Sequence, residues 1–141
     1  MKKNRPVVPL LLLCLLLVVF LGGCNAGKKE IEKVKDLEFT VVPDNNVPEE
    51  LLQIIDEKKE TPFKLKYTST DNEYLYIVVG YGVQNSGGYS ISVDDLYLAK
   101  NAIYIDTNLI GPSKDEEITM VSTYPYIVVK LPYQEENVVY K

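Results

Sequence analysis

The sequence has no histidine and no tryptophan, and its two cysteines, Cys14 and Cys24, both lie near the amino terminus. The absence of histidine excludes a Ser-His-Asp or Cys-His catalytic relay and any imidazole ligand for a metal. The absence of cysteine after position 24 excludes a disulfide, a thiol nucleophile and a zinc knuckle in the rest of the chain. Catalysis would have to depend on carboxylates, lysine, serine or tyrosine alone. We therefore expect a protein that is not an enzyme and that has no metal or cofactor.

Positive charge is scarce once the amino terminus is set aside. Lys2, Lys3 and Arg5 are the only charged residues before Cys24, so the remainder carries 12 basic and 20 acidic groups. The resulting negative net charge does not favour sequence-independent binding to the phosphates of nucleic acid. No nucleic-acid partner is expected. The length of 141 residues allows one domain and little more.

The amino terminus has the order of a secretory signal: a short basic stretch, then an apolar run over Val7–Gly23. A transmembrane anchor is the alternative, but 17 residues is short for a span and no basic cluster follows directly. Leu21-Gly22-Gly23-Cys24 resembles a bacterial lipobox, in which the cysteine receives a diacylglycerol. Residues 1–23 are therefore expected to be a lipoprotein signal peptide. We expect a lipid on Cys24 to hold the protein at the outer face of the cell membrane.

The rest divides into a charged segment over 24–36, interpreted as a solvated tether, and a globular domain over 37–141. Pro48, two glutamates and a run of spaced Leu and Ile predict an amphipathic helix over 47–59. Alternating apolar residues predict strands over the following segments: 37–42, 63–67, 74–81, 89–98 (with a bulge near Asp94-Asp95), 102–107 and 126–131. Segment 74–81 is apolar on both faces, as expected of a central strand. One helix among strands with short turns predicts an α+β fold, a mainly antiparallel sheet with the helix packed on one face.

No motif identifies a catalytic site. The acidic runs Asp94-Asp95 and Asp115-Glu116-Glu117 lack the alternating pattern of a calcium loop. The glycine-rich segment over 80–88 leads into a strand and not a helix, so it is not a phosphate loop. Carboxylate pairs cannot be judged from spacing along the chain. A small carboxylate-dependent cell-wall hydrolase and a ligand-binding surface lipoprotein therefore remain alternatives.

Two segments stand out, Gly82-Val-Gln-Asn-Ser-Gly87-Gly88-Tyr89 and Tyr124-Pro125-Tyr126. Their glycines suit a positive φ or a close backbone approach, and their tyrosines suit either sheet packing or an interface. In this order, with an alternating strand, a hairpin and an aliphatic strand over 127–131, they resemble the C-terminal domain of the PrcB family over about 74–132. Those proteins are bacterial lipoproteins named for a protease-complex subunit. Residues 37–68 resemble the longer, lipobox-bearing Gram-positive members.

The resemblance implies a non-catalytic partner that binds and stabilises a secreted or membrane-associated protease. All eleven tyrosines lie at or after Tyr67, more than a small core needs. We therefore expect some of them to form one exposed aromatic patch beside Gly87-Gly88, through which a partner would bind. The acidic loop over 115–117 would then steer a basic partner. The tyrosines of this expected patch are Tyr74, Tyr76, Tyr89, Tyr104, Tyr124 and Tyr126.

Overall fold

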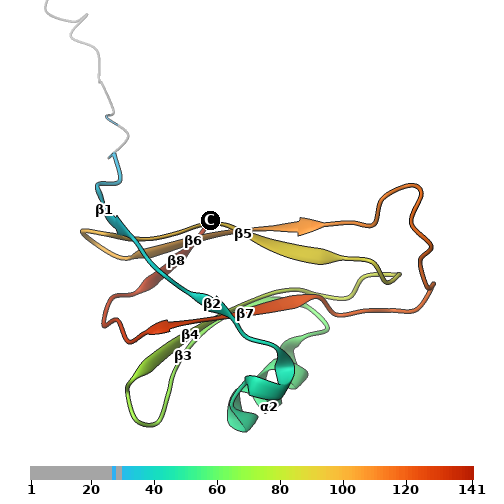
Figure 1. Cartoon of the computed structure of the whole chain (residues 1–141), viewed down its shortest axis with the longest axis horizontal. Helices are drawn as coiled ribbons and strands as arrows, with labels where there is room; N and C mark the ends of the chain where they lie inside the picture. The colour runs from blue at the N-terminus through green and yellow to red at the C-terminus, as the bar shows by residue number, and fades with distance from the viewer. Residues whose placement is uncertain (1–26, 28–29) are drawn as a thin grey trace, which may run out of the picture. The chain divides into compact units, whose positions relative to one another are not determined.

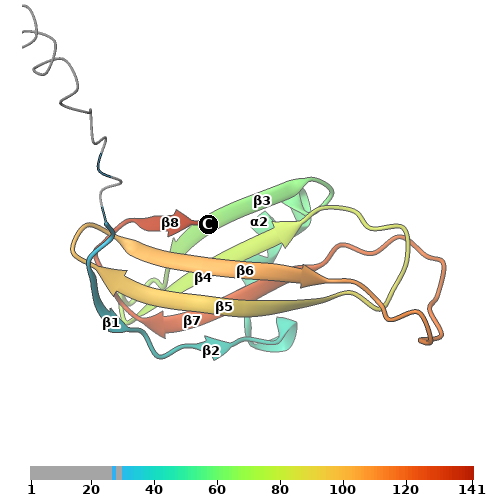
Figure 2. The same cartoon turned by 90° about the horizontal axis from the view of Figure 1, so that it is seen from above.

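The computed structural model describes residue 27 and residues 30–141. The expected signal peptide over 1–23 and the lipidation site Cys24 lie outside the described residues. Residues Ile31–Lys141 form one unit of two four-stranded sheets that face each other (Figures 1 and 2). The first sheet has the order β1 (Lys33–Asp36), β5 (Ser90–Ala99), β6 (Ile103–Ile110), β8 (Val138–Tyr140). The second has the order β2 (Thr40–Val41), β7 (Tyr126–Pro132), β4 (Tyr74–Tyr81), β3 (Pro62–Thr68).

The main core lies between the two sheets. Alternate residues of β4 point inward, and Leu75, Ile77 and Val79 pack there against Leu96 of β5 and Ile105 of β6. The other inward residues, Leu37, Ile103, Ile127, Val129 and Leu131, complete this buried cluster. Because side chains alternate across a strand, each sheet contributes one apolar face to this layer.

A second core covers the outer face of the second sheet. The helix α2 (Glu49–Lys58) follows the short helix η1 (Asp44–Asn46) and packs against this face, below the sandwich in Figure 1. Its Leu51 and Ile55 are fully buried against the outward residues of β4 and β7. Strand β4 is therefore covered on both sides, which explains why its sequence is apolar on both faces.

The predicted fold class is confirmed: the described residues form one α-helix and mostly antiparallel strands, with the helix on one face of a sheet. The bulge expected near Asp94 is present as a register shift between Val93 and Asp95. The strand expected over 37–42 is reduced to β2. The physical reason is that this segment crosses between the sheets: the Leu37 N–H bonds to Leu96 of the first sheet, and the Val42 N–H bonds to Val128 of the second.

Two edge strands and the division into two sheets were not predicted. Lys33–Asp36, the end of the segment interpreted as a tether, is strand β1 and pairs with the end of β5. Strand β8 lies at the other edge of the first sheet and pairs with β6 in parallel. Strand β1 is exposed along its whole length. Because it has no buried face, its sequence does not show the alternation of apolar and polar residues that predicts a strand.

Candidate functional site

Two loops meet at one end of the sandwich, opposite the turn that joins β5 to β6. The first, residues 82–89, connects β4 to β5 and is here called the motif loop. The second, residues 111–125, connects β6 to β7 and is here called the long loop. Both extend beyond the sheets at the right of Figures 1 and 2. Strand pairing brings them together, because β4 pairs with β7 in one sheet and β5 with β6 in the other.

Hydrogen bonds join the two loops along their length. The backbones of Gln84 and Thr123 exchange two bonds, of 2.8 and 2.9 Å. The Thr123 hydroxyl donates to the carbonyl oxygen of Ser86 at 2.7 Å, and Ser86 is buried. The Gly87 N–H donates to the carbonyl oxygen of Thr119 at 2.9 Å. The two loops are therefore linked by hydrogen bonds and form one structural unit.

Two of the three predicted motif glycines have a backbone that favours glycine. Gly82 has a φ of 73° and Gly88 a φ of 85°. A Cβ on Gly88 would lie 2.8 Å from the Pro112 side chain, and one on Gly82 would lie 2.8 Å from that of Pro62. Gly87 does not have a positive φ, and its Cβ would meet only the Thr119 oxygen at 3.8 Å. Gly87 contributes to the site through its backbone N–H, which bonds to Thr119.

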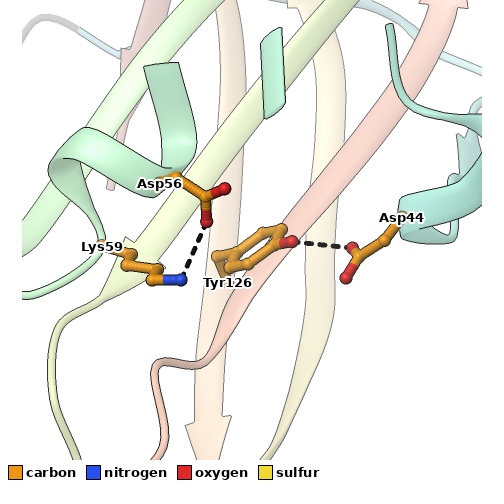
Figure 3. A network of polar contacts seen from close by, with 4 residues as sticks. All are labelled: Asp44, Asp56, Lys59 and Tyr126. Atoms are coloured by element: carbon orange, nitrogen blue, oxygen red, sulfur yellow. Dashed lines mark hydrogen bonds and ion pairs between the residues drawn. The ribbon is translucent and has the colours of Figure 1, made fainter. Parts of the chain in front are cut away.

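The Tyr124-Pro125-Tyr126 segment anchors the start of β7 to the helical side of the domain. The Tyr126 hydroxyl donates to the Asp44 carboxylate at 2.7 Å, and Lys59 pairs with Asp56 at 2.8 Å beside the same ring (Figure 3). Burial, with the bond to Asp44, raises the pKa of Tyr126 well above its ordinary value. The Tyr124 ring has the Lys59 ammonium 5.4 Å from its centroid, and the Pro125 carbonyl accepts from the Tyr81 N–H at 3.0 Å.

The expected single tyrosine patch is wrong. Tyr76 is buried beneath the helix, on the outer face of the second sheet. Tyr104 is buried on the outer face of the first sheet, where its ring stacks on Tyr97 at a centroid distance of 5.3 Å. Tyr89 lies beside Gly111 at the end of the first sheet. These side chains therefore serve different surfaces and cannot be covered together by one partner.

The exposed apolar side chains of the two loops are aliphatic and sulfur-containing, and they were not predicted. Met120 is 75% exposed, Val121 59% and Val83 48%; Ile118 of the long loop and Ile110 at the end of β6 are exposed as well. Solvent-exposed apolar groups that gather at one place mark interaction sites more often than isolated ones. The sequence signal that could have pointed to this feature is the apolar group Ile118, Met120 and Val121 directly after an acidic run.

The chain around these loops is acidic. From Gly82 to Leu98 and from Ala102 to Pro125 its one basic residue is Lys114. The acidic residues of the same two segments are Asp94, Asp95, Asp106, Asp115, Glu116 and Glu117. Of these, Asp115, Glu116 and Glu117 lie in the long loop itself, and their negative charge favours encounter with a positively charged surface.

Features that would support catalysis are few. Among the residues that the structure describes, no group of three carboxylates is placed to hold a metal ion. Hydrogen bonds from the Ser69 hydroxyl and the Glu73 backbone lower the pKa of the Asp71 carboxyl, which is unfavourable for a general acid.

None of the helices in the described part of the chain is long and apolar enough to cross a membrane.

A second surface feature is a groove of about 750 Å³ where the segment between β1 and β2 passes the ends of β4 and β7. It is lined by Leu37, Glu38, Phe39, Thr40, Tyr74, Lys130, Leu131 and Pro132. The Lys130 ammonium lies 3.7 Å from the centroid of the Tyr74 ring. The positive charge of Lys130 is therefore engaged in a cation–π contact within the domain.

A known protein family matches the part of the chain that contains the two loops. Residues 75–132 match the model of the family described as PrcB C-terminal. The matched segment runs from β4 to the last residue of β7 and so contains both loops and all the motif residues. No curated protein and no solved structure matches the sequence at a significant level.

Proposed function

Because residues 75–132 match the model of the PrcB C-terminal family, we propose that the protein is a lipid-anchored, non-catalytic partner of a protease. The family takes its name from a protease-complex subunit, which is consistent with a domain associated with such a complex. In this proposal the domain stands at the outer face of the cell membrane. There it binds and stabilises a secreted or membrane-associated protease.

The observation that carries the proposal is the end formed by the motif loop and the long loop. Their mutual hydrogen bonds hold exposed apolar side chains on an ordered backbone. An ordered surface loses little conformational freedom when it binds, so it suits a docking element. Catalysis instead needs convergent acid, base or nucleophilic groups in a concave site.

The anchor is proposed from the sequence alone. Leu21-Gly22-Gly23-Cys24 has the order of a lipobox, and eight residues separate Cys24 from Lys33, where β1 begins. Eight extended residues reach about 26 Å, enough to lift the domain clear of a membrane surface. The lipid would then hold the domain among the proteins of the same membrane.

The test is capture from native membranes. The full-length chain with a carboxyl-terminal tag is expressed in its own cells, and the membranes are treated with a mild lysine cross-linker. The proposal predicts that a protease co-purifies with the chain, and that removing the chain from the cells shortens the lifetime of that protease at the surface. Capture without a protease, or an unchanged protease lifetime, would contradict the proposal.

A cell-wall assay addresses the hydrolase alternative. The purified domain is incubated with isolated cell wall, and released sugar or peptide fragments are measured by mass spectrometry. The proposal predicts no release above a heat-treated control. Fragment release that is lost on replacing a specific carboxylate would identify the domain as an enzyme.

The groove beside Tyr74 is the observation that favours the ligand-binding alternative. A ligand held there would contact Phe39, so Phe39→Ala would lower affinity without affecting the loops at the far side of the domain. Thermal-shift measurements of the wild type and this variant, against a panel of sugars and short peptides, test this alternative. A ligand-induced shift that Phe39→Ala removes would establish it.

A further inference from the structure

We propose that Met120 is the anchor of the docking end and inserts into an apolar pocket on a protein partner whose rim carries lysine or arginine. This inference rests on the proposed function and specifies the contact that the partner makes. It assigns a role to a residue that neither the motif nor the family match singles out.

The first observation is the turn that displays Met120. The carbonyl oxygen of Thr119 accepts two hydrogen bonds of 2.9 Å, one from the Val121 N–H and one from the Gly87 N–H. The bond from Val121 closes a three-residue turn with Met120 at its centre. The bond from Gly87 fixes the same carbonyl from the motif loop, so the turn is held on both sides.

The second observation is the exposure of Met120. Its side chain is 75% exposed, more than any other large apolar side chain described. A tight turn and a hydrogen bond between the loops hold this residue in place, although its side chain has little contact with the rest of the domain. Exposing this much apolar surface is unfavourable in water, so the arrangement is explained best by a partner that covers it.

The third observation is the support around the turn. The Ile118 side chain would lie 3.2 Å from a Cβ on Gly88, so Ile118 covers this glycine directly. The backbone bridge between Gln84 and Thr123 closes the loops on the other side of the turn. Val121 and Val83 add exposed apolar surface on the same two loops. An anchor held in this way loses little freedom on binding.

The chemistry of the partner follows from the residue type and from the charge. Methionine is enriched in protein interfaces because its flexible, polarisable side chain adapts to apolar pockets. The acidic residues Asp115, Glu116 and Glu117 precede the turn, with Lys114 as their one basic neighbour in the loop. Segments that bind membrane surfaces instead combine apolar residues with lysine and arginine. The occupant is therefore a protein surface with a basic rim and not a lipid surface.

Site-specific photocrosslinking tests the contact directly. A benzophenone amino acid replaces Met120 in one variant and Val34 in another, and both full-length chains are irradiated in their own cells. Val34 is a matched control, since it is 56% exposed and lies in β1, which pairs with the end of β5 away from the loops. We expect a product at position 120 containing the protein captured by lysine cross-linking, and none at position 34.

The possible outcomes separate this inference from the proposed function. No product at position 120, with the lysine cross-linked partner still present, overturns the inference and leaves the proposed function standing. No product with either reagent overturns both. Equal products at positions 120 and 34, or a product with lipid at position 120, also overturn the inference.

Affinity measurements with the captured protein, once purified, give the size of the effect. Met120→Ala should weaken binding by about tenfold or more, the level of an interface hot spot. Met120→Leu keeps volume and apolarity and should bind within about twofold of the wild type. Val34→Ala should bind like the wild type. Circular dichroism should show all three variants folded, and an Ala variant that is folded and binds normally refutes the proposal.

Discussion

The backbone N–H of Gly87 donates a hydrogen bond of 2.9 Å to the carbonyl oxygen of Thr119, 32 positions further along the chain. This bond joins the motif loop to the segment that leads into Tyr124-Pro125-Tyr126. It gives a physical reason why a Gly-Gly-Tyr motif and a Tyr-Pro-Tyr motif occur together in one domain. The first motif supplies the donor and the permissive backbone, and the second fixes where the long loop enters β7.

The first prediction separates the three glycines of the motif loop. Gly88→Ala and Gly82→Ala should each lower the free energy of unfolding by about 1–3 kcal/mol, because a Cβ is strained at positive φ. Gly87→Ala should be nearly neutral, since its φ is not positive and the nearest atom to its Cβ is 3.8 Å away. Urea denaturation of the three variants measures the difference. A loss for Gly87→Ala as large as that for Gly88→Ala would contradict this account.

How far the sequence predicts this fold depends on whether a signal is local. The helix near 49–58 and its end before Pro62 are predictable because acidic residues, spaced aliphatics and proline act within a few turns. The central position of β4 is predictable because its two covered faces leave a continuous apolar run. The assignment of strands to two sheets is not predictable from the sequence. A strand face that packs on a helix and one that packs on another sheet are both apolar and have the same composition.

The candidate site was predictable in part for the same reason. The glycines of the motif loop were expected to permit a positive φ, and the structure shows one at Gly82 and Gly88 but not at Gly87. The tyrosine patch was wrong because side-chain alternation gives the face of a strand but not the sheet to which the strand belongs. Met120 was missed because backbone hydrogen bonds hold its turn, and no pattern of side chains encodes them.

The second prediction compares two tyrosine hydroxyls. The Tyr140 hydroxyl is buried and has no hydrogen-bond partner among the residues described, whereas the Tyr126 hydroxyl donates to Asp44 at 2.7 Å. Tyr140→Phe should therefore leave the stability unchanged or raise it by about 1 kcal/mol, because it removes an unsatisfied buried group. Tyr126→Phe should lower the stability by about 1 kcal/mol, because it removes a bond to a charged acceptor. Thermal denaturation near pH 7 distinguishes the two, and equal shifts in Tm would contradict the assignment.

The third prediction concerns alkaline pH. Burial raises the pKa of Tyr140 from 10.0 to about 12. Between these values the unfolded chain releases the phenolic proton while the folded chain keeps it, so stability falls as pH rises through this window. The contribution is fully present below pH 10, where both states keep the proton.

Denaturation of the wild type and Tyr140→Phe at several pH values between 9 and 12 isolates this residue from the other tyrosines. The stability difference in favour of Tyr140→Phe should grow above pH 10, by an amount on the order of 2 kcal/mol. A difference that stays constant across this range would show that the Tyr140 hydroxyl is not buried in solution.

The fourth prediction concerns the anchor. Cys24→Ser should abolish labelling with a radioactive fatty acid and leave an uncleaved precursor, because no other thiol lies near the expected cleavage site. Cys14→Ser is the matched control and should label and mature normally, because Cys14 lies within the segment that cleavage removes. Gel mobility and fatty-acid labelling of both variants in cells provide the measurement. Normal maturation of the Cys24 variant would refute the lipid anchor. Loss of labelling in both variants would instead mean that the apolar run itself had been damaged, so the control decides whether the thiol at position 24 is the modified group.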